Sequence, residues 1–333
     1  MKLIIFLPAF NEEGSIQQVI ASLPQALGQI DIIQCLVIDD GSTDHTAEFA
    51  VTSGAKVVSH TVNRGVGRAL QSAVQFALEN DADILVGIDA DGQFNPSEIP
   101  ALIEPIIMNK ADMVIGNRFV EGMPEHMSHA KYWGNKQMTT LINYITGQKF
   151  QDVSCGFRAY GREALLRLNL FADFTYTHET ILSLIFQGLR VVESPIKVRY
   201  YPERKSRVAG SLLRYAIQTS KIIFRVLLDY RPIQVFGMTG SVLIAIGIAC
   251  VLYLLGYYVL TQNFTPYKSL GFIGLGIVIF GMLVLLIALV ADMLNRLRIN
   301  QDKLLYEMKR ARYQKTNERK TIMLDHDNLE KIS

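Results

Sequence analysis

Short apolar runs alternate with longer amphipathic stretches from the start of the chain to about residue 120. The apolar runs predict β-strands at Leu3–Leu7, Cys35–Ile38, Lys56–Ser59, Ile84–Ile88 and Met113–Ile115. The amphipathic stretches predict helices at 13–27, 44–53, 66–80 and 97–108, the last of them with Ser97 as its N-cap. Strands that alternate with helices predict an α/β fold with a Rossmann-like, mostly parallel sheet flanked by helices.

A second region, about 121–210, has a mixed pattern. Residues 131–146 and 177–187 predict helices, and residues 190–200 predict a strand. We therefore expect residues 1–210 to form one domain.

Two long apolar stretches follow this domain. Residues 236–260 and 270–291 are almost free of charge, and each is long enough to cross a hydrocarbon layer of about 30 Å. Because so few residues separate them, we expect a transmembrane hairpin over 233–295. Two buried helices of a soluble core are the alternative, although uncharged stretches of this length are rare in soluble folds.

The segments on either side of the hairpin are basic. Residues 211–232 place Arg214, Lys221 and Arg225 on one helical face, which predicts an amphipathic helix in the headgroup plane or, alternatively, one packed on a core. Residues 296–333 form a basic tail that suits anionic lipid as well as a solvated helix.

Charge also predicts the orientation of the hairpin. The flanking segments are rich in Arg and Lys, whereas the connecting loop has only Lys268. The positive-inside rule then places both termini and the first domain in the cytoplasm of a bacterial or archaeal cell. No signal peptide precedes the first strand, and three scattered cysteines among 333 residues suit a reducing compartment. A net charge of +2 gives no indication of nucleic-acid binding, and a homo-oligomer remains open.

Two carboxylates follow the strand at Ile84–Ile88 directly, in the turn Asp89-Ala90-Asp91-Gly92-Gln93. Side chains two apart in extended chain point the same way, so Asp89 and Asp91 converge on one point. Hard oxygen donors of this kind suit Mg²⁺ or Mn²⁺, which typically bridge protein carboxylates to phosphates.

Other polar turns also follow predicted strands. Pro8-Ala9-Phe10-Asn11-Glu12 follows the first strand, and Asp39-Asp40-Gly41-Ser42-Thr43-Asp44 follows the second, with Asp44 as a further candidate N-cap. Ligands of parallel sheets bind at the carboxyl ends of the strands, where all three turns fall. Together they predict a single site.

Six motifs occur in order along the chain: Pro8–Glu12, Asp39–Asp44, Asn63-Arg64-Gly65-x-Gly67-x-Ala69, Asp89–Gln93, Gly116-Asn117-Arg118 and Asp152-x-x-x-Gly156-Phe157-Arg158. The series resembles the family-two glycosyltransferases of the GT-A fold. Within that family it is most similar to the polyprenyl-phosphate glycosyltransferases, the group that includes dolichyl-phosphate mannose synthase. The resemblance covers about residues 1–210, and the hairpin fits the membrane-anchored members.

The resemblance implies metal-dependent, inverting transfer of one hexose from a UDP- or GDP-linked sugar to a polyprenyl phosphate. It implies a metal site of Asp89, Asp91 and Gln93 for Mg²⁺ or Mn²⁺. It implies that the nucleotide pocket is lined by Pro8, Ala9, Asn11, Glu12, Asp39, Asp40 and Ala90. It assigns the reacting phosphates to Asp91, Arg118, Lys131 and Arg204, with Lys205 and Arg207 in a loop that closes over them.

The chain departs from the family pattern at two positions. Val66 stands where the glycine-rich turn often has Lys, and Gly210-Ser211-Leu212 lacks the usual Lys. Both departures affect the set of cations around the phosphates. The Gln-x-x-Arg-Trp motif of processive synthases is absent from the sequence, which argues against chain elongation.

The chemistry explains why basic residues are expected. A lipid phosphate is already anionic and needs cations rather than a general base, and Arg suits bidentate phosphate contacts. A second reading is transfer to another lipid or glycan, with Asp152 or Glu179 as the base. A third is a scaffold without activity, although both metal carboxylates are present. His178 has no spaced partner for zinc, and a helix-start or packing role is expected.

Overall fold

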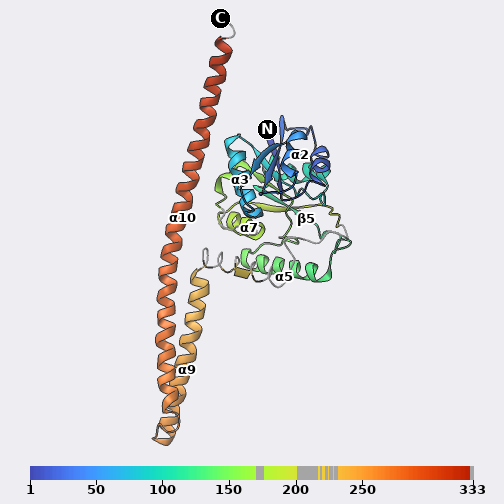
Figure 1. Ribbon diagram of the computed structural model, residues 1–333. Helices are drawn as coiled ribbons and strands as arrows, with labels where there is room; N and C mark the ends of the chain where they lie inside the picture. Colours follow the sequence, from blue (N-terminus) through green and yellow to red (C-terminus); the bar gives the residue numbers. More distant parts are fainter. Residues whose placement is uncertain are drawn as a thin grey trace. The chain divides into compact units, whose positions relative to one another are not determined.

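The computed structural model describes residues 1–169, 176–200 and 232–330, together with Ile217, Ser220, Lys221, Phe224 and Leu228. The chain divides into two compact units (Figure 1). The first comprises Met1–Ile222 with Leu305–Ser333, and the second comprises Ile223–Leu304. The predicted interfacial helix at 211–232 and the predicted phosphate loop with Arg204, Lys205 and Arg207 lie almost wholly outside the described residues.

The first unit is built on a seven-stranded sheet in the order β3-β2-β1-β4-β6-β5-β7. The strands are β1 (Lys2–Ala9), β2 (Ile32–Asp39), β3 (Lys56–Ser59), β4 (Ile84–Gly87), β5 (Met113–Asn117), β6 (Arg158–Gly161) and β7 (Val191–Pro195). All paired neighbours are parallel except those of β6, which runs antiparallel between β4 and β5. The predicted mostly parallel sheet is therefore confirmed, with one reversed strand.

The register of the strands places the polar turns at one edge of the sheet. Ala9 pairs with Asp39, and Asp39 pairs with Ser59, so β1, β2 and β3 end together. Gly87, at the end of β4, pairs with Arg158 at the start of β6. Because β6 is reversed, its amino end joins the carboxyl ends of its neighbours. This edge holds the candidate site.

Helices pack on the sheet through apolar faces. They are α1 (Ile16–Ala21), α2 (Thr46–Thr52), α3 (Val66–Glu79), the 3₁₀ turn η1 (Pro96–Glu98), α4 (Ile99–Ile107), α5 (His129–Thr146), α6 (Arg162–Arg167) and α7 (Thr177–Phe186). α3 packs on β1 and β2, α4 packs on β4, β5, β6 and β7, and α5 packs on α7. The central strands β1, β4, β5 and β6 are almost entirely buried, which makes the middle of the sheet the core of the unit.

Two predicted helix boundaries are wrong. The helix expected at 13–27 ends at Ala21, because Pro24 offers no backbone N–H and its ring would clash with the carbonyl of Ile20. Ser97 is not the N-cap of the helix at 97–108. Asn95 takes that role, since its Oδ1 accepts from the Ser97 N–H at 3.1 Å and Pro96 occupies the first helical position.

The short elements β6 and α6 were not predicted. Four residues of β6, Arg158-Ala159-Tyr160-Gly161, lack an apolar run, yet all four are buried. The strands on either side bury these residues, and their own sequence has no apolar pattern. A search for hydrophobic periodicity therefore does not detect this strand. β6 nevertheless fixes the site, because it joins β4 to β5.

The last part of α10 (Lys268–Glu330) belongs to the first unit and contacts α6. The Tyr306 hydroxyl donates to Glu163 Oε2 at 3.2 Å, and the Arg167 guanidinium lies 4.6 Å from the ring centre of Tyr306. Lys309 Nζ donates to the Leu168 carbonyl at 2.9 Å and to Asn169 Oδ1 at 2.8 Å. This part of the basic tail is thus held by specific polar contacts.

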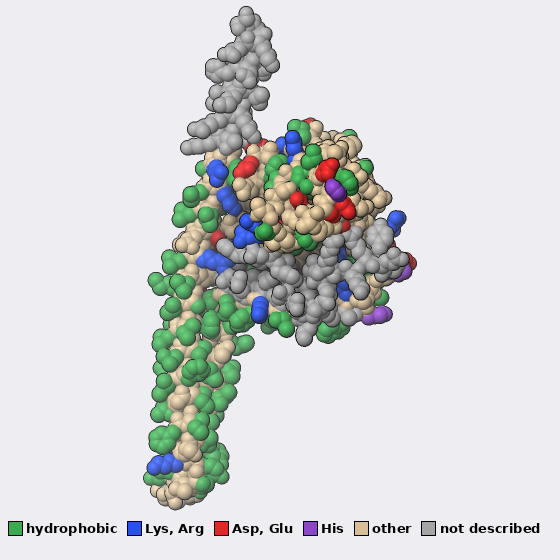
Figure 2. All heavy atoms as spheres, viewed as in Figure 1, with side chains coloured by type: hydrophobic (Ala, Val, Ile, Leu, Met, Phe, Trp, Pro, Cys, Tyr) green, Lys and Arg blue, Asp and Glu red, His purple; other side chains and the backbone are tan. Residues whose placement is uncertain are grey.

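The second unit is a helical hairpin of the π-helical turn η2 (Ile233–Gly237), α9 (Met238–Thr261) and the first part of α10. Two helices, Ile233–Thr261 and Lys268–Tyr313, are long and apolar enough to cross a membrane by length and composition. Only 6% and 17% of their most apolar windows are buried, which is unlike the core helices of a soluble protein. Figure 2 shows these helices covered with hydrophobic side chains.

Small residues bring the two helices of the hairpin together. A Cβ on Gly247 would come within 2.7 Å of the Gly274 carbonyl oxygen, and one on Gly240 would come within 3.0 Å of the Gly281 carbonyl oxygen. Glycine therefore permits backbone contact of a kind that holds helices together in lipid.

We expect Gly247→Leu to destabilise the hairpin by about 1–3 kcal/mol, because the added side chain must displace the backbone of α10. Gly256→Leu is the matched control in α9, since no heavy atom lies within 4 Å of a Cβ at Gly256. Unfolding of both full-length variants by rising SDS in mixed micelles, followed by circular dichroism, measures the difference. Equal midpoints for the two variants would contradict the close packing.

Candidate active site

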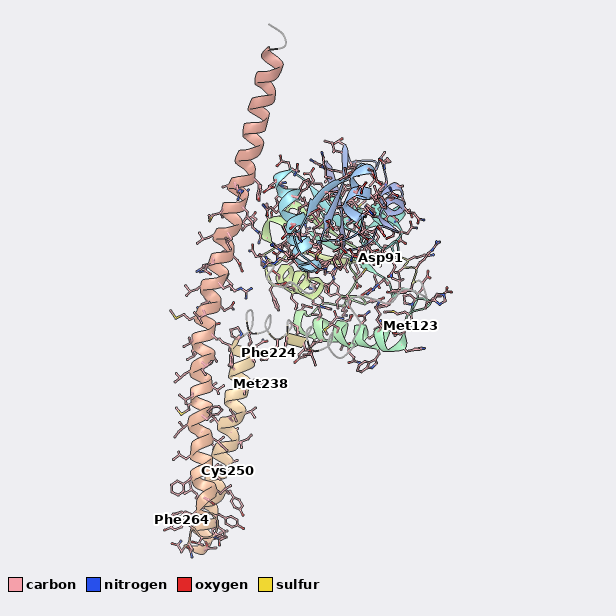
Figure 3. All side chains as sticks on the ribbon, in the orientation of Figure 1. Asp91, Met123, Phe224, Met238, Cys250 and Phe264 are labelled. Atoms are coloured by element: carbon pink, nitrogen blue, oxygen red, sulfur yellow. The ribbon has the colours of Figure 1, made fainter. Side chains whose placement is uncertain are left out.

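The turn after β4 presents the two carboxylates that the sequence pattern singles out. Gly92 has φ +73°, which reverses the chain, and the Gln93 N–H donates to Asp91 Oδ1 at 3.0 Å to close the turn. The Gln93 carbonyl accepts from the Arg199 N–H at 2.9 Å, so the segment before Tyr200 runs beside the turn. Asp91 is labelled in Figure 3 at this edge of the domain.

Asp89 is partly open to solvent and enclosed by protein on its other sides. Burial, and then the nearby charge of Asp91, raise the pKa of Asp89 to about 7, whereas Arg118 and Lys131 oppose the rise. Gly156 lies against this carboxylate, since a Cβ there would come within 3.3 Å of Asp89 Oδ2. A side chain larger than glycine would press directly on the carboxylate.

The donor set fits a hard divalent cation that completes its coordination with substrate oxygens. Asp89 and Asp91 supply carboxylate oxygens, and an ion between them would relieve the repulsion that raises the pKa of Asp89. Within the described ranges, no three His, Cys, Asp or Glu side chains gather as a complete metal site. Mg²⁺ and Mn²⁺ commonly bind in this way, with few protein ligands and with phosphate oxygens.

The turns after β1 and β2 interlock. The Asn11 N–H donates to Ser42 Oγ at 2.9 Å, and Asn11 Oδ1 accepts from the Thr43 N–H at 2.9 Å. The Glu12 N–H donates to Thr46 Oγ1 at 2.8 Å. Pro8, Ala9, Asn11, Glu12 and Asp39 are thereby gathered at one place. Ser15 Oγ also donates to the Ala90 carbonyl at 2.9 Å, which ties this pair of turns to the turn that holds Asp89 and Asp91.

Asp40 is an anchor for the loop that precedes α3. Its carboxylate accepts from the Arg64 N–H at 2.9 Å and the Gly65 N–H at 2.7 Å, and His60 Nδ1 lies 2.7 Å from Oδ1. His60 Nε2 lies 2.9 Å from Ser72 Oγ on α3. Since Asp40 is only 5% exposed, its position favours organising the pocket over contacting a nucleotide.

Arg118 follows β5 and forms a bidentate ion pair with Asp152. Nε lies 2.6 Å from Oδ2 and Nη2 lies 2.9 Å from Oδ1, while Nη1 donates to the Tyr200 hydroxyl at 3.0 Å. Burial opposes the charge of the guanidinium, but Asp152 outweighs it and raises the pKa of Arg118 well above its usual value. Arg118 therefore stays cationic and is fixed in direction.

Lys131 brings a second cation to the same place from the first turn of α5. Ser128 caps this helix, with its Oγ accepting from the Lys131 N–H at 3.3 Å, and Lys131 Nζ lies 4.8 Å from the ring centre of Tyr200. Burial and the charge of Arg118 lower the pKa of Lys131, whereas Asp91 and Asp89 raise it. Four of the predicted site residues that the structure describes thus lie close together. They are the carboxylates Asp89 and Asp91 and the cations Arg118 and Lys131.

Arg158 belongs to the motif pattern but has a structural role. Its buried guanidinium donates to the carbonyls of Cys155, Thr177 and Val153 at 2.6, 2.7 and 2.9 Å and to Thr180 Oγ1 at 2.8 Å. These bonds tie the Asp152–Gly156 loop to the start of α7. Arg158 is therefore a brace for the site rather than a group that contacts phosphate.

Three site residues were missed by sequence reasoning. Tyr200 orients Arg118 and Lys131, and the Tyr176 hydroxyl donates to the Gly156 carbonyl at 3.3 Å behind Asp89. Glu193 Oε1 accepts from the Asp152 N–H at 2.7 Å. A charged residue directly after the valine pair Val191-Val192, within a predicted strand, was a usable signal. Nothing in the local sequence distinguished Tyr176 or Tyr200 from other tyrosines.

Asp152 and Glu179, the two alternative general bases, differ in how well they could accept a proton. Although burial alone would raise the pKa of Asp152, the charge of Arg118 lowers it below its usual value, and both carboxylate oxygens are engaged. Asp152 is therefore a poor base. Glu179 lies in the first turn of α7, is 8% exposed and remains the carboxylate to test. His178 is fully buried in the same turn, and burial lowers its pKa to about 3, in keeping with a packing role.

Comparison with known proteins gives a consistent result. Residues 4–168, about half of the chain, match the family model described as Glycosyl transferase family 2. Glycosyltransferase AglJ of Haloferax volcanii is 28% identical over 312 residues, which cover 91% of this chain and 97% of that protein. Undecaprenyl-phosphate mannosyltransferase of Micrococcus luteus is 28% identical over 231 residues, 65% of this chain and 91% of that protein.

A solved structure shares the fold of the first unit. Glucosyl-3-phosphoglycerate synthase from Mycobacterium tuberculosis, in complex with Mn²⁺ and UDP-glucose, superimposes with a TM-score of 0.54 and 25% identity. The match covers 68% of this chain and 78% of that chain.

The raised pKa of Asp89 predicts how metal binding depends on pH. A cation must displace the proton of Asp89, so the apparent Mn²⁺ affinity should be nearly constant above a pH of about 7 and fall below it. The fall should approach about tenfold per pH unit for one displaced proton. Free Mn²⁺ measured by electron paramagnetic resonance provides the affinity. Asp31→Asn, at the amino end of β2, should retain the profile, and an affinity independent of pH would refute it.

The Arg118–Asp152 pair predicts coupled stability. Asp152→Asn leaves a buried guanidinium unpaired and should lower the free energy of unfolding by about 3–5 kcal/mol, whereas adding Arg118→Met should restore part of that loss. Asp112→Asn is the control, because its partner Arg190 is 48% exposed, and should cost at most about 1 kcal/mol. Urea unfolding followed by tryptophan fluorescence measures these differences. Additive losses in the double variant would show that the two residues are not coupled.

Proposed function

The chain belongs to glycosyl transferase family 2, and we propose that it transfers a single hexose from a nucleotide sugar to a polyprenyl phosphate with inversion at the anomeric carbon. The general activity, a glycosyltransferase of the type that acts on polyprenyl phosphates, is supported by relatives with such names. The donor, the metal dependence, the membrane face and the site residues are our proposals. The proposal includes both UDP- and GDP-linked hexoses as donors.

One observation supports this proposal most strongly. Asp89 and Asp91 act electrostatically on Lys131, which in turn lies beside Arg118. The two carboxylates that we propose as metal ligands therefore lie close to both cations. Two anionic substrates, a nucleotide diphosphate and a lipid phosphate, need such an arrangement, because without cations their like charges would keep them apart.

The residues of this chain then have distinct tasks. The divalent ion, held by Asp89 and Asp91 with Gln93 nearby, would supply Lewis-acid stabilisation of the departing diphosphate. The interlocked turns with Pro8, Asn11 and Asp39 would hold the nucleotide. Arg118 and Lys131 would hold the acceptor phosphate so that its oxygen faces the anomeric carbon, with Arg204, Lys205 and Arg207 as further cations.

Bond changes follow from this placement. An oxygen of the lipid phosphate forms the new bond to the anomeric carbon from one side while the bond to the nucleotide diphosphate breaks on the other. The products are a polyprenyl-phosphate hexose and the nucleoside diphosphate. Because the attacking oxygen is already anionic, no side chain has to remove a proton, which agrees with the engagement of Asp152 by Arg118.

The hairpin would place this reaction at a membrane. Aromatic side chains gather near its turn, with ring centres 5.4 Å apart for Tyr253 and Tyr267 and 4.3 Å apart for Tyr258 and Phe264. Tyrosine is typical of membrane interfaces, so this cluster suits one end of a span. Phe264 is labelled at the turn in Figure 3. By the positive-inside rule, the basic flanks support our proposal that the catalytic unit lies on the cytoplasmic face.

A second candidate is transfer to a neutral hydroxyl of another lipid or a glycan. It would need a base, and Glu179 is the remaining carboxylate. Glu179→Gln should abolish turnover under this alternative and leave most of it under the main proposal. The kcat of this variant with the preferred acceptor separates the two.

The direct test uses purified full-length protein in detergent with Mn²⁺ or Mg²⁺, undecaprenyl phosphate and a panel of radiolabelled UDP- and GDP-hexoses. One donor should label the organic phase, and a chelator should stop the reaction. Asp91→Asn should lower kcat by at least about 100-fold, since it removes a ligand of the charge-stabilising ion. Asp83→Asn is the matched control, because it makes the same change at the amino end of β4.

The possible outcomes distinguish the parts of the proposal. Hydrolysis of the donor without labelled lipid would support the proposed nucleotide-sugar donor and refute the proposed lipid acceptor. Full activity of Asp91→Asn, or activity in excess chelator, would refute the proposed metal-binding role of Asp89 and Asp91.

A further inference from the structure

We propose that Glu193, in strand β7, is a positioning residue for the acceptor phosphate. It fixes the loop that carries Asp152 and thereby sets the direction in which Arg118 presents its remaining N–H donors. Glu193 acts through these two residues and not by contact with a substrate. The role rests on the proposed transfer to a lipid phosphate.

Glu193 lies in the middle of β7 and points away from α4. It pairs with Ile115 of β5. The next residue, Ser194, points to the other face of the sheet, where its Oγ donates to the Ala101 carbonyl of α4 at 3.1 Å. Because side chains alternate along a strand, Glu193 points to the face opposite α4, where the loop with Asp152 lies.

The carboxylate of Glu193 holds two consecutive backbone N–H groups. Oε1 accepts from the Gln151 N–H at 2.8 Å and from the Asp152 N–H at 2.7 Å. Oε2 lies 3.0 Å from the same Gln151 nitrogen. Residues 151 and 152 belong to no strand or helix, so this carboxylate supplies the acceptors that a sheet neighbour would otherwise provide.

Asn117 joins the same group from the end of β5. Its Nδ2 donates to Gln151 Oε1 at 3.2 Å and lies 3.4 Å from Glu193 Oε2, and its Oδ1 accepts from the Phe119 N–H at 2.9 Å. Asn117 is 4% exposed. Glu193 thus fixes the residue before Asp152, and Asn117 fixes the residues on either side of Arg118.

A carboxylate in this place carries a cost that packing alone does not explain. Burial raises the pKa of Glu193, and the charge of Asp152 adds to the rise, whereas the N–H groups of Asp152 and Gln151 and the charge of Lys136 oppose it. A neutral residue would fill the same space without the cost of burial or of repulsion. Holding the loop accounts for the charged side chain.

Arg118 gains a fixed direction from this arrangement. A guanidinium has five N–H donors, and contacts with Asp152 and Tyr200 engage one each on Nε, Nη2 and Nη1. The second donors of Nη1 and Nη2 remain for a phosphate, which suits the planar geometry of arginine. Since Asp152 binds Nε and Nη2 together, a shift of its loop turns the whole guanidinium. A displacement of about 1 Å can cost about 100-fold in rate.

Kinetics of the full-length protein in detergent separate positioning from folding. Glu193→Ala should raise the KM for farnesyl phosphate about tenfold and change kcat and the donor KM by less than about threefold, because the acceptor phosphate is charged before and during the reaction. Glu193→Gln keeps one oxygen that accepts from both N–H groups and should restore most of the affinity. A purely structural role would lower kcat through loss of folded protein and leave both KM values unchanged, which would overturn the proposal.

Asp112→Ala is the matched control. Asp112 also accepts a backbone N–H, from Arg190 at 2.8 Å, but at the amino ends of β5 and β7. Its loss should change neither KM. An equal rise in the KM for farnesyl phosphate in this variant would show that general loosening of the two strands, and not the contact of Glu193 with the loop, sets the affinity.

A double-variant cycle tests whether Glu193 acts through Arg118. The affinity for farnesyl phosphate is measured by isothermal titration calorimetry with Mn²⁺ and UDP present. Arg118→Met should weaken binding by itself, and Glu193→Ala added to it should weaken binding by less than about twofold more. A further loss of about tenfold in the Arg118→Met background would show that Glu193 acts elsewhere and would contradict the proposal.

Hydrogen exchange followed by mass spectrometry gives a readout that needs no substrate. Glu193→Ala should speed exchange in residues 150–157 at least about tenfold, with Glu193→Gln between it and the wild type and Asp112→Ala unchanged there. Unchanged exchange in Glu193→Ala would overturn the hold on the loop. If the exchange pattern is as expected but the wild type neither binds farnesyl phosphate nor glycosylates it, the proposed acceptor is refuted and the fixing of Arg118 by Glu193 stands.

Discussion

Charge balance at the carboxyl edge of the sheet constrains the rest of the structure. Asp89 and Asp91 lie one residue apart in a partly enclosed turn, where burial and mutual repulsion raise the pKa of Asp89 to about 7. Nearby cations favour the charged form of both carboxylates. The fold provides these cations as Arg118 and Lys131. Arg118 is in turn fixed by Asp152, whose loop is tied to α7 by the buried Arg158. Arg158 thus holds the loop with Asp152, and Asp152 fixes Arg118 near the two carboxylates.

The sequence was most informative where local pattern and tertiary structure agree. Six of the seven strands and the longer helices follow from apolar periodicity, and the positions of Asp89 and Asp91 follow from the end of an apolar run. β6 was missed because its four residues are buried by their neighbours rather than marked by their own sequence. The helix expected at 13–27 is too long, because Pro24 ends it early and apolar periodicity alone does not register a proline. Tyr200 could not be found, since its contacts with Arg118 and Lys131 join residues far apart in the chain.

One segment of the chain joins the two cations of the candidate site. Arg118 ends β5, the loop with Val120 and Met123 follows, and α5 begins with Lys131 in its first turn. One continuous segment therefore combines a fixed cation, a partly apolar surface and a second cation. The two apolar helices of the second unit are long and apolar enough to cross a membrane, which is consistent with the proposed lipid acceptor.

The central claim is that a metal-bound donor and a lipid phosphate meet between the carboxylates and the cations. Phosphorus NMR of the full-length protein with Mn²⁺, UDP and a short-chain polyprenyl phosphate tests it, because Mn²⁺ broadens only phosphorus nuclei close to it. The account predicts broadening of both UDP and lipid phosphate in the wild type. In Lys131→Met it predicts broadening of UDP alone. Broadening of UDP without any effect on the lipid phosphate in the wild-type protein would contradict the account.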